Sequence, residues 1–249
     1  MNSVTVKRLG ILALCLAMTA TAAVTAFRGV EHHRQAARPV AAVAPPPRVT
    51  LVIDAGHGGE DGGAVSPGGA RESVINLDVA RRLYQLMGFF GMDAVMTRAA
   101  ERIQYSESAS TVRARKAEDQ KNRLSLLRAA ENAVLVSIHQ NKYTSAGPFG
   151  AQVLFAPTGG SEEFAKEMQA LLVSSLNPGN HRAAAKIQDS IYLMNNVKCP
   201  AVLIECGFLS NPTEEALLQT DAYRLKIAAV IAAGFLRSQP ALRDVIFSG

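Results

Sequence analysis

The sequence LVIDAGHGGEDGGAVSPGGARE, residues 51–72, indicates how the rest of the chain is arranged. Four apolar or β-branched positions, 50–53, predict a buried strand that ends at Asp54. Seven glycines between residues 56 and 69 then permit backbone turns that side chains would block. This loop carries His57, and Glu72 opens the helix that follows it. A strand that delivers a histidine and a glutamate through such a loop is well suited to hold a metal ion.

The length and composition of the chain set the first limits on its function. Its 249 residues, 48% of them hydrophobic, suit one α/β domain preceded by an N-terminal extension. The net charge of +5 and the pI near 9.3 would favour a nucleic-acid partner if the excess charge lay in the folded body. However, residues 1–50 hold six lysines and arginines and one glutamate, and the remainder is balanced at 20 cations and 20 anions. We therefore expect no nucleic-acid partner.

The N-terminal residues have the pattern of an export signal. Lys7 and Arg8 precede the apolar residues 10–27, a basic end followed by a hydrophobic run. This run of 18 residues is at the lower limit for a membrane span, so a cleaved signal peptide and a retained membrane anchor both stay open for residues 1–27. Residues 28–48 contain four prolines and are expected to form a linker. We expect an exported protein, secreted or anchored outside the cytoplasmic membrane.

Strand and helix patterns alternate through the body of the chain. Apolar runs predict strands at residues 50–54, 92–97, 133–138, 151–156, 191–194 and 201–205. Longer periodic segments predict helices at 73–90, 116–131, 161–175, 213–219 and 221–237. This alternation predicts a single α/β domain, residues 49–238, with a twisted, mostly parallel sheet that helices cover on both faces. A polar loop is expected at 99–115 and a loose tail at 239–249.

Four ionisable side chains are expected to meet at one edge of this sheet. His57 and His139 each follow a buried strand, Glu72 follows the glycine-rich loop, and Glu205 ends the last strand. The carboxyl ends of parallel strands lie at the same edge, where ligands bind in sheets of this class. Glu205 is the most informative of the four, because a carboxylate on an apolar strand costs of the order of several kcal/mol to bury unless it is paired or near a metal.

Two histidines and one carboxylate are a common ligand set for catalytic zinc, which keeps a fourth position for water. A spare carboxylate can then accept the proton of that water. From the residues alone, a single histidine after a strand is also explained as an ordinary hydrogen-bonded side chain. A nucleotide-binding loop is disfavoured, because GHGGEDGG lacks the GxGxxG order and because Glu60 and Asp61 would repel phosphate. No CxxC spacing supports a zinc–thiolate site.

The chain resembles the zinc-dependent N-acetylmuramoyl-L-alanine amidases of the Amidase_3 family over roughly residues 49–236. The motifs that carry the resemblance are IDAGHGGEDGGA (53–64), RESVINLDVARRL (71–83), VMTR (95–98), SIHQN (137–141) and PAVLIECGFLSNP (200–212). The resemblance implies the twisted, mostly parallel sheet described above. It also implies that one zinc ion is bound by His57, Glu72 and His139, and that Glu205 is the catalytic carboxylate.

The resemblance implies a reaction as well. A water activated at the zinc attacks the amide between the lactyl group of N-acetylmuramic acid and the L-alanine of the stem peptide, so peptidoglycan is the implied substrate. Glu205 takes the proton of that water and later delivers it to the leaving amine. The zinc polarises the carbonyl oxygen of the amide.

In the details of its motifs, the chain is most similar to the CwlD-type amidases of spore-forming bacteria. Those enzymes remove stem peptides from spore cortex and so prepare muramic δ-lactam, which implies cortex maturation here, with the space between the forespore membranes as a location. A general amidase of division or wall turnover is the alternative. Division-type members often carry a long inserted helix after the SIH strand, and residues 142–150 are too few to hold one. We therefore expect control by an activator protein or by the timing of expression.

Several further polar residues are candidates for supporting roles. Asn141, Arg182 and Lys186 are candidates for binding the substrate, with surface or turn hydrogen bonds as the alternative for each. Arg123 is expected to fix a loop or a helix end, and Asn211 to form a turn before a helix. Two other functions stay open. One is a wall-binding protein without catalysis, which would not need Glu205, and the other is a zinc hydrolase of a different amide.

Overall fold

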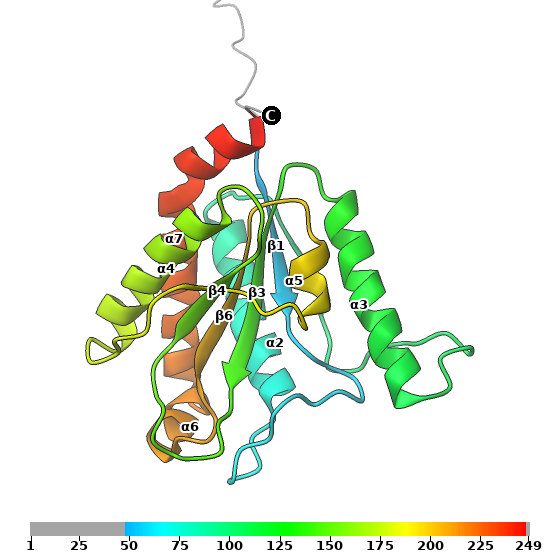
Figure 1. Ribbon diagram of the computed structural model, residues 1–249, viewed down its shortest axis with the longest axis vertical. Coiled ribbons are helices and arrows are strands. Elements are labelled where there is room, and N and C mark those ends of the chain that lie inside the picture. Colours follow the sequence, from blue (N-terminus) through cyan, green and yellow to red (C-terminus); the bar gives the residue numbers. More distant parts are fainter. Residues whose placement is uncertain (1–47, 248–249) are drawn as a thin grey trace, which may run out of the picture. The chain divides into compact units, whose positions relative to one another are not determined.

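The computed structural model describes residues 48–247. The predicted leader, residues 1–27, and the predicted linker up to Pro47 lie outside the described residues. From Arg48 onward the chain forms one compact unit of alternating strands and helices (Figure 1). The predicted fold class, a single α/β domain in this part of the chain, is confirmed.

A six-stranded sheet forms the centre of this unit. Its strands are β1 (Thr50–Ala55), β2 (Ala94–Met96), β3 (Ala133–Asn141), β4 (Gln152–Phe155), β5 (Ala185–Lys186) and β6 (Ala201–Phe208), in the order β2-β1-β3-β6-β4-β5. The pairing of β4 with β6 is antiparallel, and the other four pairings of the sheet are parallel. The central strands β1, β3 and β6 are nearly continuous apolar runs, as expected where helices cover both faces.

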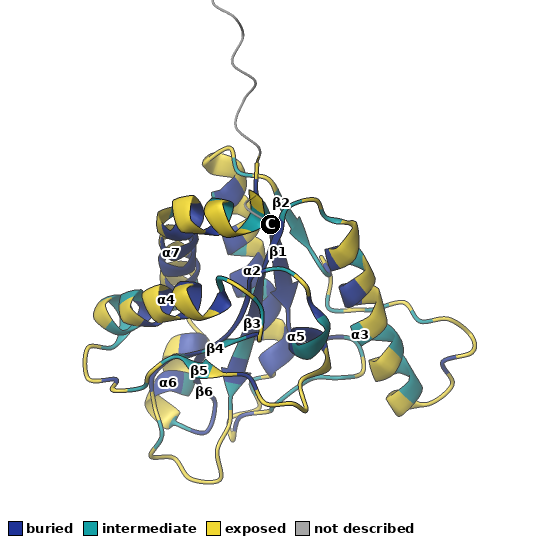
Figure 2. Cartoon of the chain, turned by 45° about the horizontal axis from the view of Figure 1, so that its top comes forward, coloured by how far each residue is buried: buried dark blue, intermediate teal, exposed yellow. Residues whose placement is uncertain are grey.

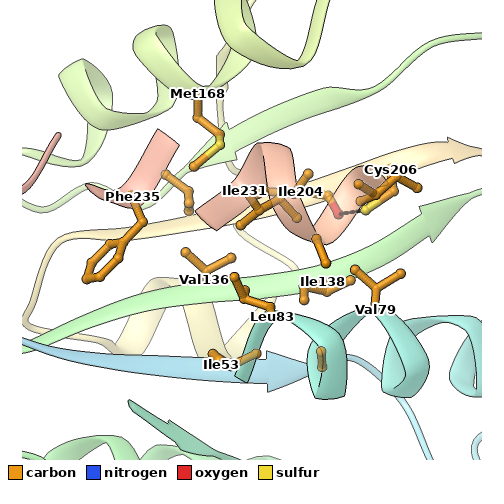
Figure 3. Close-up of a cluster of buried hydrophobic side chains, with 14 of the residues drawn as sticks. Ile53, Val79, Leu83, Val136, Ile138, Met168, Ile204, Cys206, Ile231 and Phe235 are labelled. Atoms are coloured by element: carbon orange, nitrogen blue, oxygen red, sulfur yellow. Dashed lines mark hydrogen bonds between the residues drawn. The ribbon is translucent and has the colours of Figure 1, made fainter. Parts of the chain in front are cut away.

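Helices pack on both faces of the sheet and divide its core in two. One face is covered by α2 (Glu72–Phe89), α4 (Ser161–Leu176) and α7 (Asp221–Phe247), and the other by α3 (Val112–Ala129) and α5 (Tyr192–Asn196). Because side chains alternate along a strand, Leu51 and Ile53 pack on the first face and Val52 on the second. Figure 2 shows the buried central strands, and Figure 3 shows side chains of the sheet meeting those of α2, α4 and α7.

Capping side chains account for where two helices begin. Thr111 accepts a hydrogen bond from the backbone N–H of Ala114 at 3.1 Å, so α3 starts four residues earlier than its predicted start at residue 116. Asn211 accepts hydrogen bonds from the N–H groups of the second and third residues of α6 (Pro212–Leu218). The predicted turn before a helix at Asn211 is therefore confirmed.

The predicted strand at residues 191–194 is wrong. Tyr192–Asn196 is the short helix α5, and the edge of the sheet is instead completed by the two residues of β5. Leu193 and Met194 are buried in the core beside α3, which either secondary structure would allow. A short apolar run does not distinguish a strand from a buried helical turn, because both hide the same residues.

The loose tail predicted at residues 239–249 is also wrong as far as the described residues extend, because α7 continues to Phe247. Pro240 removes one backbone donor from this helix, which is why the sequence favours an earlier end. Leu242 is only 2% exposed, and Ser238 donates a hydrogen bond to Glu167 of α4 at 2.7 Å. Packing of these residues against α4 therefore keeps α7 helical beyond Pro240, although the proline disfavours a helix there.

By length and composition, α7 is the one helix among residues 48–247 that could cross a membrane. However, it packs against α2 and α4 and contributes Ile227, Ile231 and Phe235 to the core. Its apolar composition is therefore that of a core helix.

Candidate metal centre

The residues predicted to carry the chemistry lie at the carboxyl edge of the sheet. In the chain, β1 is followed by β2 on one side of it and then by β3 on the other side (Figure 2), so the ends of β1 and β3 flank a switch point of the topology. A cleft of about 400 Å³ opens there. Its lining includes His57, Glu72, His139 and Glu205. The sheet thus brings together the four residues that the sequence separates.

The register of the sheet places two of these side chains on the same face, at the cleft. His139 of β3 lies directly opposite Glu205 of β6. Both alternate in phase with Leu135 and Leu203, which pack on the face covered by α3 and α5. An imidazole and a carboxylate therefore emerge side by side from neighbouring strands on that face.

Three side chains converge as a candidate metal site: His57, Glu72 and His139. Oε1 of Glu72 lies 3.0 Å from Nδ1 of His139 and 3.3 Å from Nε2 of His57. The two imidazole rings are 4.9 Å apart at an angle of 76°. One donor atom from each residue lies within 4.8 Å of the other two. Donors this close can share one ion with bonds of roughly 2.0–2.2 Å after small adjustments.

The glycine-rich loop turns sharply to bring His57 into this cluster. His57 has a φ of +60°, a left-handed conformation that is uncommon for a residue with a side chain. Gly56 lies against the ring of His139, where a Cβ atom would be 2.2 Å from Nε2. At Gly63, which has a φ of +66°, a Cβ atom would be 2.5 Å from Oε2 of Glu72. These two glycines allow the loop to approach the other two candidate ligands closely.

Glu72 is the first residue of α2 and is 3% exposed. Its carboxylate accepts hydrogen bonds from the backbone N–H groups of Ala64 at 2.8 Å and Gln140 at 3.1 Å, and from the side chain of Asn76 at 3.3 Å. Burial opposes its charge, but the two imidazoles hold the pKa of the Glu72 carboxyl well below its usual range. Glu72 is therefore an ionised carboxylate fixed in place, which is the state that metal binding requires.

Asp61 supports His57, a role that was not expected from the sequence. One carboxylate oxygen of Asp61 lies 3.0 Å from Nδ1 of His57, and the other lies 3.0 Å from Nζ of Lys116. Burial opposes the charge of His57, but hydrogen bonds to Asp61 and Glu72 raise the pKa of His57 to about 9. Metal-binding histidines commonly donate their second N–H to a carboxylate, which orients the ring. The sequence carries no periodic signal for this contact, because residues 57–61 lie in a loop and not on a helix.

Glu205 lines the cleft from β6, and its Oε2 has no hydrogen-bond partner among the described residues. Burial raises the pKa of its carboxyl to about 7, against the opposing effect of His139. A carboxyl group that titrates near neutral pH is suited to exchange a proton with a reacting group. The unpartnered buried oxygen also marks a place where a water molecule or a substrate group is expected.

This arrangement fits a divalent metal ion held by two imidazoles and one carboxylate. Catalytic zinc sites use three protein ligands of these types and keep the fourth position open. Glu205 lies outside the three-residue cluster but shares its cleft. Its unpartnered Oε2 would remain free if an ion were bound by the other three residues.

The three candidate substrate residues lie in different places. Asn141 ends β3 and lines the cleft. Arg182 and Lys186 are not among the residues that line it. Arg182 donates to a backbone carbonyl of the β3–β4 connection at 3.1 Å and stacks over the ring of Phe208 at 4.6 Å. Lys142, which the sequence did not single out, lines the cleft next to Asn141.

A larger hollow of about 810 Å³ lies between the loop of residues 101–109 and Gly59–Glu60 of the glycine-rich loop. None of the three candidate ligands lines this hollow, and neither does Glu205. Size alone would favour the hollow, but the converging donors favour the smaller cleft as the candidate site.

Comparison with known proteins finds relatives for almost the whole compact unit. The family model Amidase_3, described as N-acetylmuramoyl-L-alanine amidase, matches residues 51–237. The germination-specific N-acetylmuramoyl-L-alanine amidase of Bacillus subtilis (strain 168) is 38% identical over 188 residues, which are 75% of this chain and 78% of that protein. The N-acetylmuramoyl-L-alanine amidase AmiC of Neisseria meningitidis is 26% identical, and the match covers 76% of this chain and 52% of that protein.

Solved structures of amidases are also similar to this chain. The CwlD amidase from Clostridioides difficile, in complex with the GerS lipoprotein, is similar with a TM-score of 0.74 and 34% identity, over 78% of this chain and 100% of that chain. An N-acetylmuramoyl-L-alanine amidase from Clostridium difficile 630 has a TM-score of 0.66 and 27% identity, over 78% of this chain and 98% of that chain. The segment matched by the family, residues 51–237, contains every residue of the candidate site.

Proposed function

Because the chain belongs to the Amidase_3 family of N-acetylmuramoyl-L-alanine amidases, we propose that it is a zinc-dependent enzyme of spore cortex maturation. Membership makes the chain a cell-wall amidase, which hydrolyses the amide between N-acetylmuramic acid and the L-alanine of the stem peptide in peptidoglycan. The observation that carries the proposed mechanism is the convergence of His57, Glu72 and His139 beside the unpartnered carboxyl of Glu205.

His57, Glu72 and His139 would hold one zinc ion per chain, with Asp61 orienting the ring of His57. When bound, the ion lowers the pKa of a water molecule and polarises the carbonyl of the scissile amide. Two imidazoles among the donors support zinc over magnesium or calcium, which prefer oxygen ligands throughout.

Glu205 is the proposed acid–base residue. Its carboxylate accepts a proton as the amide carbonyl is attacked and returns it to the amine of the leaving L-alanine. A pKa near 7 supports both steps, because the group can be found in either state at neutral pH. The lack of another partner at Oε2 leaves that atom available for the transfer.

The residues that line the cleft suit it to bind the stem peptide. Leu193 and Met194 of α5 give one wall an apolar surface, which fits the methyl groups of the lactyl unit and of L-alanine. We infer that Asn141, Arg182 and Lys186 contact the rest of the stem peptide, the last two from beyond the cleft lining. Replacing each residue with alanine should raise KM and leave kcat unchanged. If a variant changes neither constant, the residue replaced in it does not bind the substrate.

The proposed spore role rests on named relatives. The Bacillus subtilis relative at 38% identity is a germination-specific amidase, and the similar structure at 34% identity is a CwlD amidase. We infer that this chain removes stem peptides from cortex, so that muramic δ-lactam can form. A general role in division or wall turnover is the second candidate, because AmiC of Neisseria meningitidis also matches, at 26% identity.

An activator protein is proposed as a partner. The similar CwlD amidase was solved in complex with a lipoprotein, GerS. In the present structure, residues 142–151 between β3 and β4 contain no helix that could cover the cleft, so control from that connection is not supported. Residues 1–27 would export the chain, cleaved or retained as an anchor, and place it with its peptidoglycan substrate outside the cytoplasmic membrane, between the forespore membranes.

Product analysis tests the reaction. Purified peptidoglycan incubated with the protein should gain free L-alanine amino termini, and release of acetate or of D-alanine would contradict the assignment. The spore role is tested separately in a strain that lacks the gene. Its cortex should contain no muramic δ-lactam, whereas a normal content of lactam would favour the second candidate.

A further inference from the structure

Two buried arginines surround the turn that carries His57. Arg98 ends the VMTR motif just after β2, and Arg123 lies in α3; they are 8% and 3% exposed. Neither belongs to the cluster of candidate ligands. Burying a guanidinium is unfavourable unless its N–H groups and its charge are satisfied, so the partners of these two side chains indicate what they are for.

Arg123 holds the backbone on either side of Gly56. Its Nη2 donates to the carbonyl of His57 at 2.5 Å, and its Nη1 donates to the carbonyl of Ala55 at 2.9 Å. Two carboxylates fix the guanidinium and balance its charge. Nη1 lies 2.9 Å from Oδ1 of Asp54, and Nε lies 2.9 Å from Oδ2 of Asp119.

Arg98 joins this turn to the helix that carries Glu72. Its Nε donates to the carbonyl of Ala55 at 2.9 Å, and its Nη2 donates to the carbonyls of Gly56 at 3.1 Å and Ser73 at 2.8 Å. Ser73 follows Glu72 directly at the start of α2. One guanidinium therefore links the two segments that present His57 and Glu72.

The conformation of the turn explains why these donors are needed. A left-handed residue other than glycine, such as His57, is strained and persists only where its surroundings hold it. Each carbonyl of residues 55–57, where the chain leaves the sheet, accepts a hydrogen bond from one or both arginines. The planar guanidinium offers five N–H donors in a fixed fork, which the single ammonium group of lysine cannot reproduce.

We propose that Arg98 and Arg123 form an arginine clamp that holds the backbone of residues 55–57 and so fixes the spacing of His57 and Glu72 needed to bind zinc. Both are positioning residues, since they act through the backbone of the ligand-bearing segments. The inference rests on the proposed zinc function. It assigns a role to the VMTR motif and to Arg123 that the chemistry of amide hydrolysis alone does not require. Loss of the clamp should weaken metal binding more than it slows the chemistry of the loaded enzyme.

Zinc titration of the metal-stripped, full-length protein against a competing chelator tests the clamp. The variants are Arg98→Lys and Arg123→Lys, and the matched control is Arg128→Lys, at an exposed position of the same helix as Arg123. Both clamp variants should raise the Kd for zinc about 10- to 100-fold, whereas the control should leave it unchanged. At saturating zinc, kcat should recover to within a few-fold of the wild-type value. A purely structural role would lower the unfolding temperature and leave the Kd for zinc unaltered.

Asp119→Asn provides a milder variant, should either arginine substitution prevent folding. Asp119 is partly exposed and contacts Arg123 but not the turn, so its loss should loosen the clamp and raise the Kd several-fold. Folded variants that all bind zinc within about twofold of wild type would overturn the clamp. Wild-type protein that binds no zinc would instead contradict the proposed function, so the two failures are distinguishable.

Discussion

Glu205 is the residue on which the proposed chemistry depends, because its buried Oε2 has no partner among residues 48–247 and its carboxyl titrates near neutral pH. The substitution Glu205→Gln keeps the shape of the side chain and removes its ability to exchange a proton. We expect kcat to fall by about 10²- to 10⁴-fold, with zinc content unchanged. Kinetics on peptidoglycan fragments and metal analysis of the same samples check this prediction. A fully active variant would remove the role assigned to Glu205.

His57 makes zinc binding depend on pH. Its pKa is raised to about 9 in the metal-free protein, and a metal ligand must release that proton. Zinc affinity should therefore rise with pH up to about 9, by roughly tenfold per pH unit while His57 starts protonated. Competition titrations at several pH values, corrected for protonation of the chelator, measure this slope. Asp61→Asn is the control, because losing the carboxylate lowers the pKa of His57 and should flatten the slope. An affinity that does not change with pH in wild type would contradict the prediction.

Three of the four candidate site residues could be located from the sequence because they end or follow apolar runs. His57, His139 and Glu205 stand at or just beyond strands whose apolar pattern is unmistakable, and the topology of parallel sheets brings such positions to one edge. The support of His57 by Asp61 could not be predicted in the same way. It depends on the left-handed turn at His57, and the backbone of an irregular loop leaves no periodic signal.

The turn after β1 can approach His139 closely only because Gly56 has no side chain. A methyl group at Gly56 would lie 2.2 Å from Nε2 of His139, so Gly56→Ala must displace either the loop or a candidate ligand. We expect this variant to lose bound zinc and to unfold at a lower temperature. Gly88→Ala in α2 is the matched control, because a Cβ atom there meets nothing within 4 Å and should stabilise the helix by up to about 1 kcal/mol. Normal zinc content in Gly56→Ala would contradict the described packing.

The last turns of α7 are predicted to contribute to stability. Leu242 is 2% exposed, so Leu242→Ala should lower the free energy of unfolding by about 2–5 kcal/mol. Leu225→Ala in the same helix, where the residue is 46% exposed, should have a much smaller effect. Denaturant titration of both variants makes the comparison. Equal effects would indicate that residues 239–247 do not pack as described.

At the scale of elements, local signals succeeded wherever a long periodic segment was also buried. The strands at 50–55, 133–141 and 201–208 and the helices α2 and α4 have such patterns, and the structure contains all of them. The errors at 191–194 and 239–247 arose where short or proline-containing segments are shaped by their neighbours. Leu193 and Met194 pack beside α3, and Leu242 is buried with α7 against α4, contacts between elements distant in sequence that no local pattern specifies.

Among the residues that the structure describes, the candidate site and the hydrophobic core lie within the compact unit that begins at Arg48. A protein that starts at Arg48 should therefore fold cooperatively, with an unfolding temperature within about 3 °C of the full-length protein and the same affinity for zinc. Thermal unfolding and zinc titration of the two proteins in parallel measure this. A shorter protein that is unfolded, or that binds zinc more weakly, would mean that residues 1–47 contribute to the fold or to the site.

The proposed amide hydrolysis requires three side chains, 15 to 82 positions apart in the sequence, to share one metal ion. The most direct test measures zinc content and peptidoglycan products on the same samples of wild type and His139→Ala. Wild type should contain about one zinc per chain and generate L-alanine amino termini, and His139→Ala should lose both. Full activity in metal-free wild type, or a His139→Ala variant that keeps both the zinc and the products, would contradict the account.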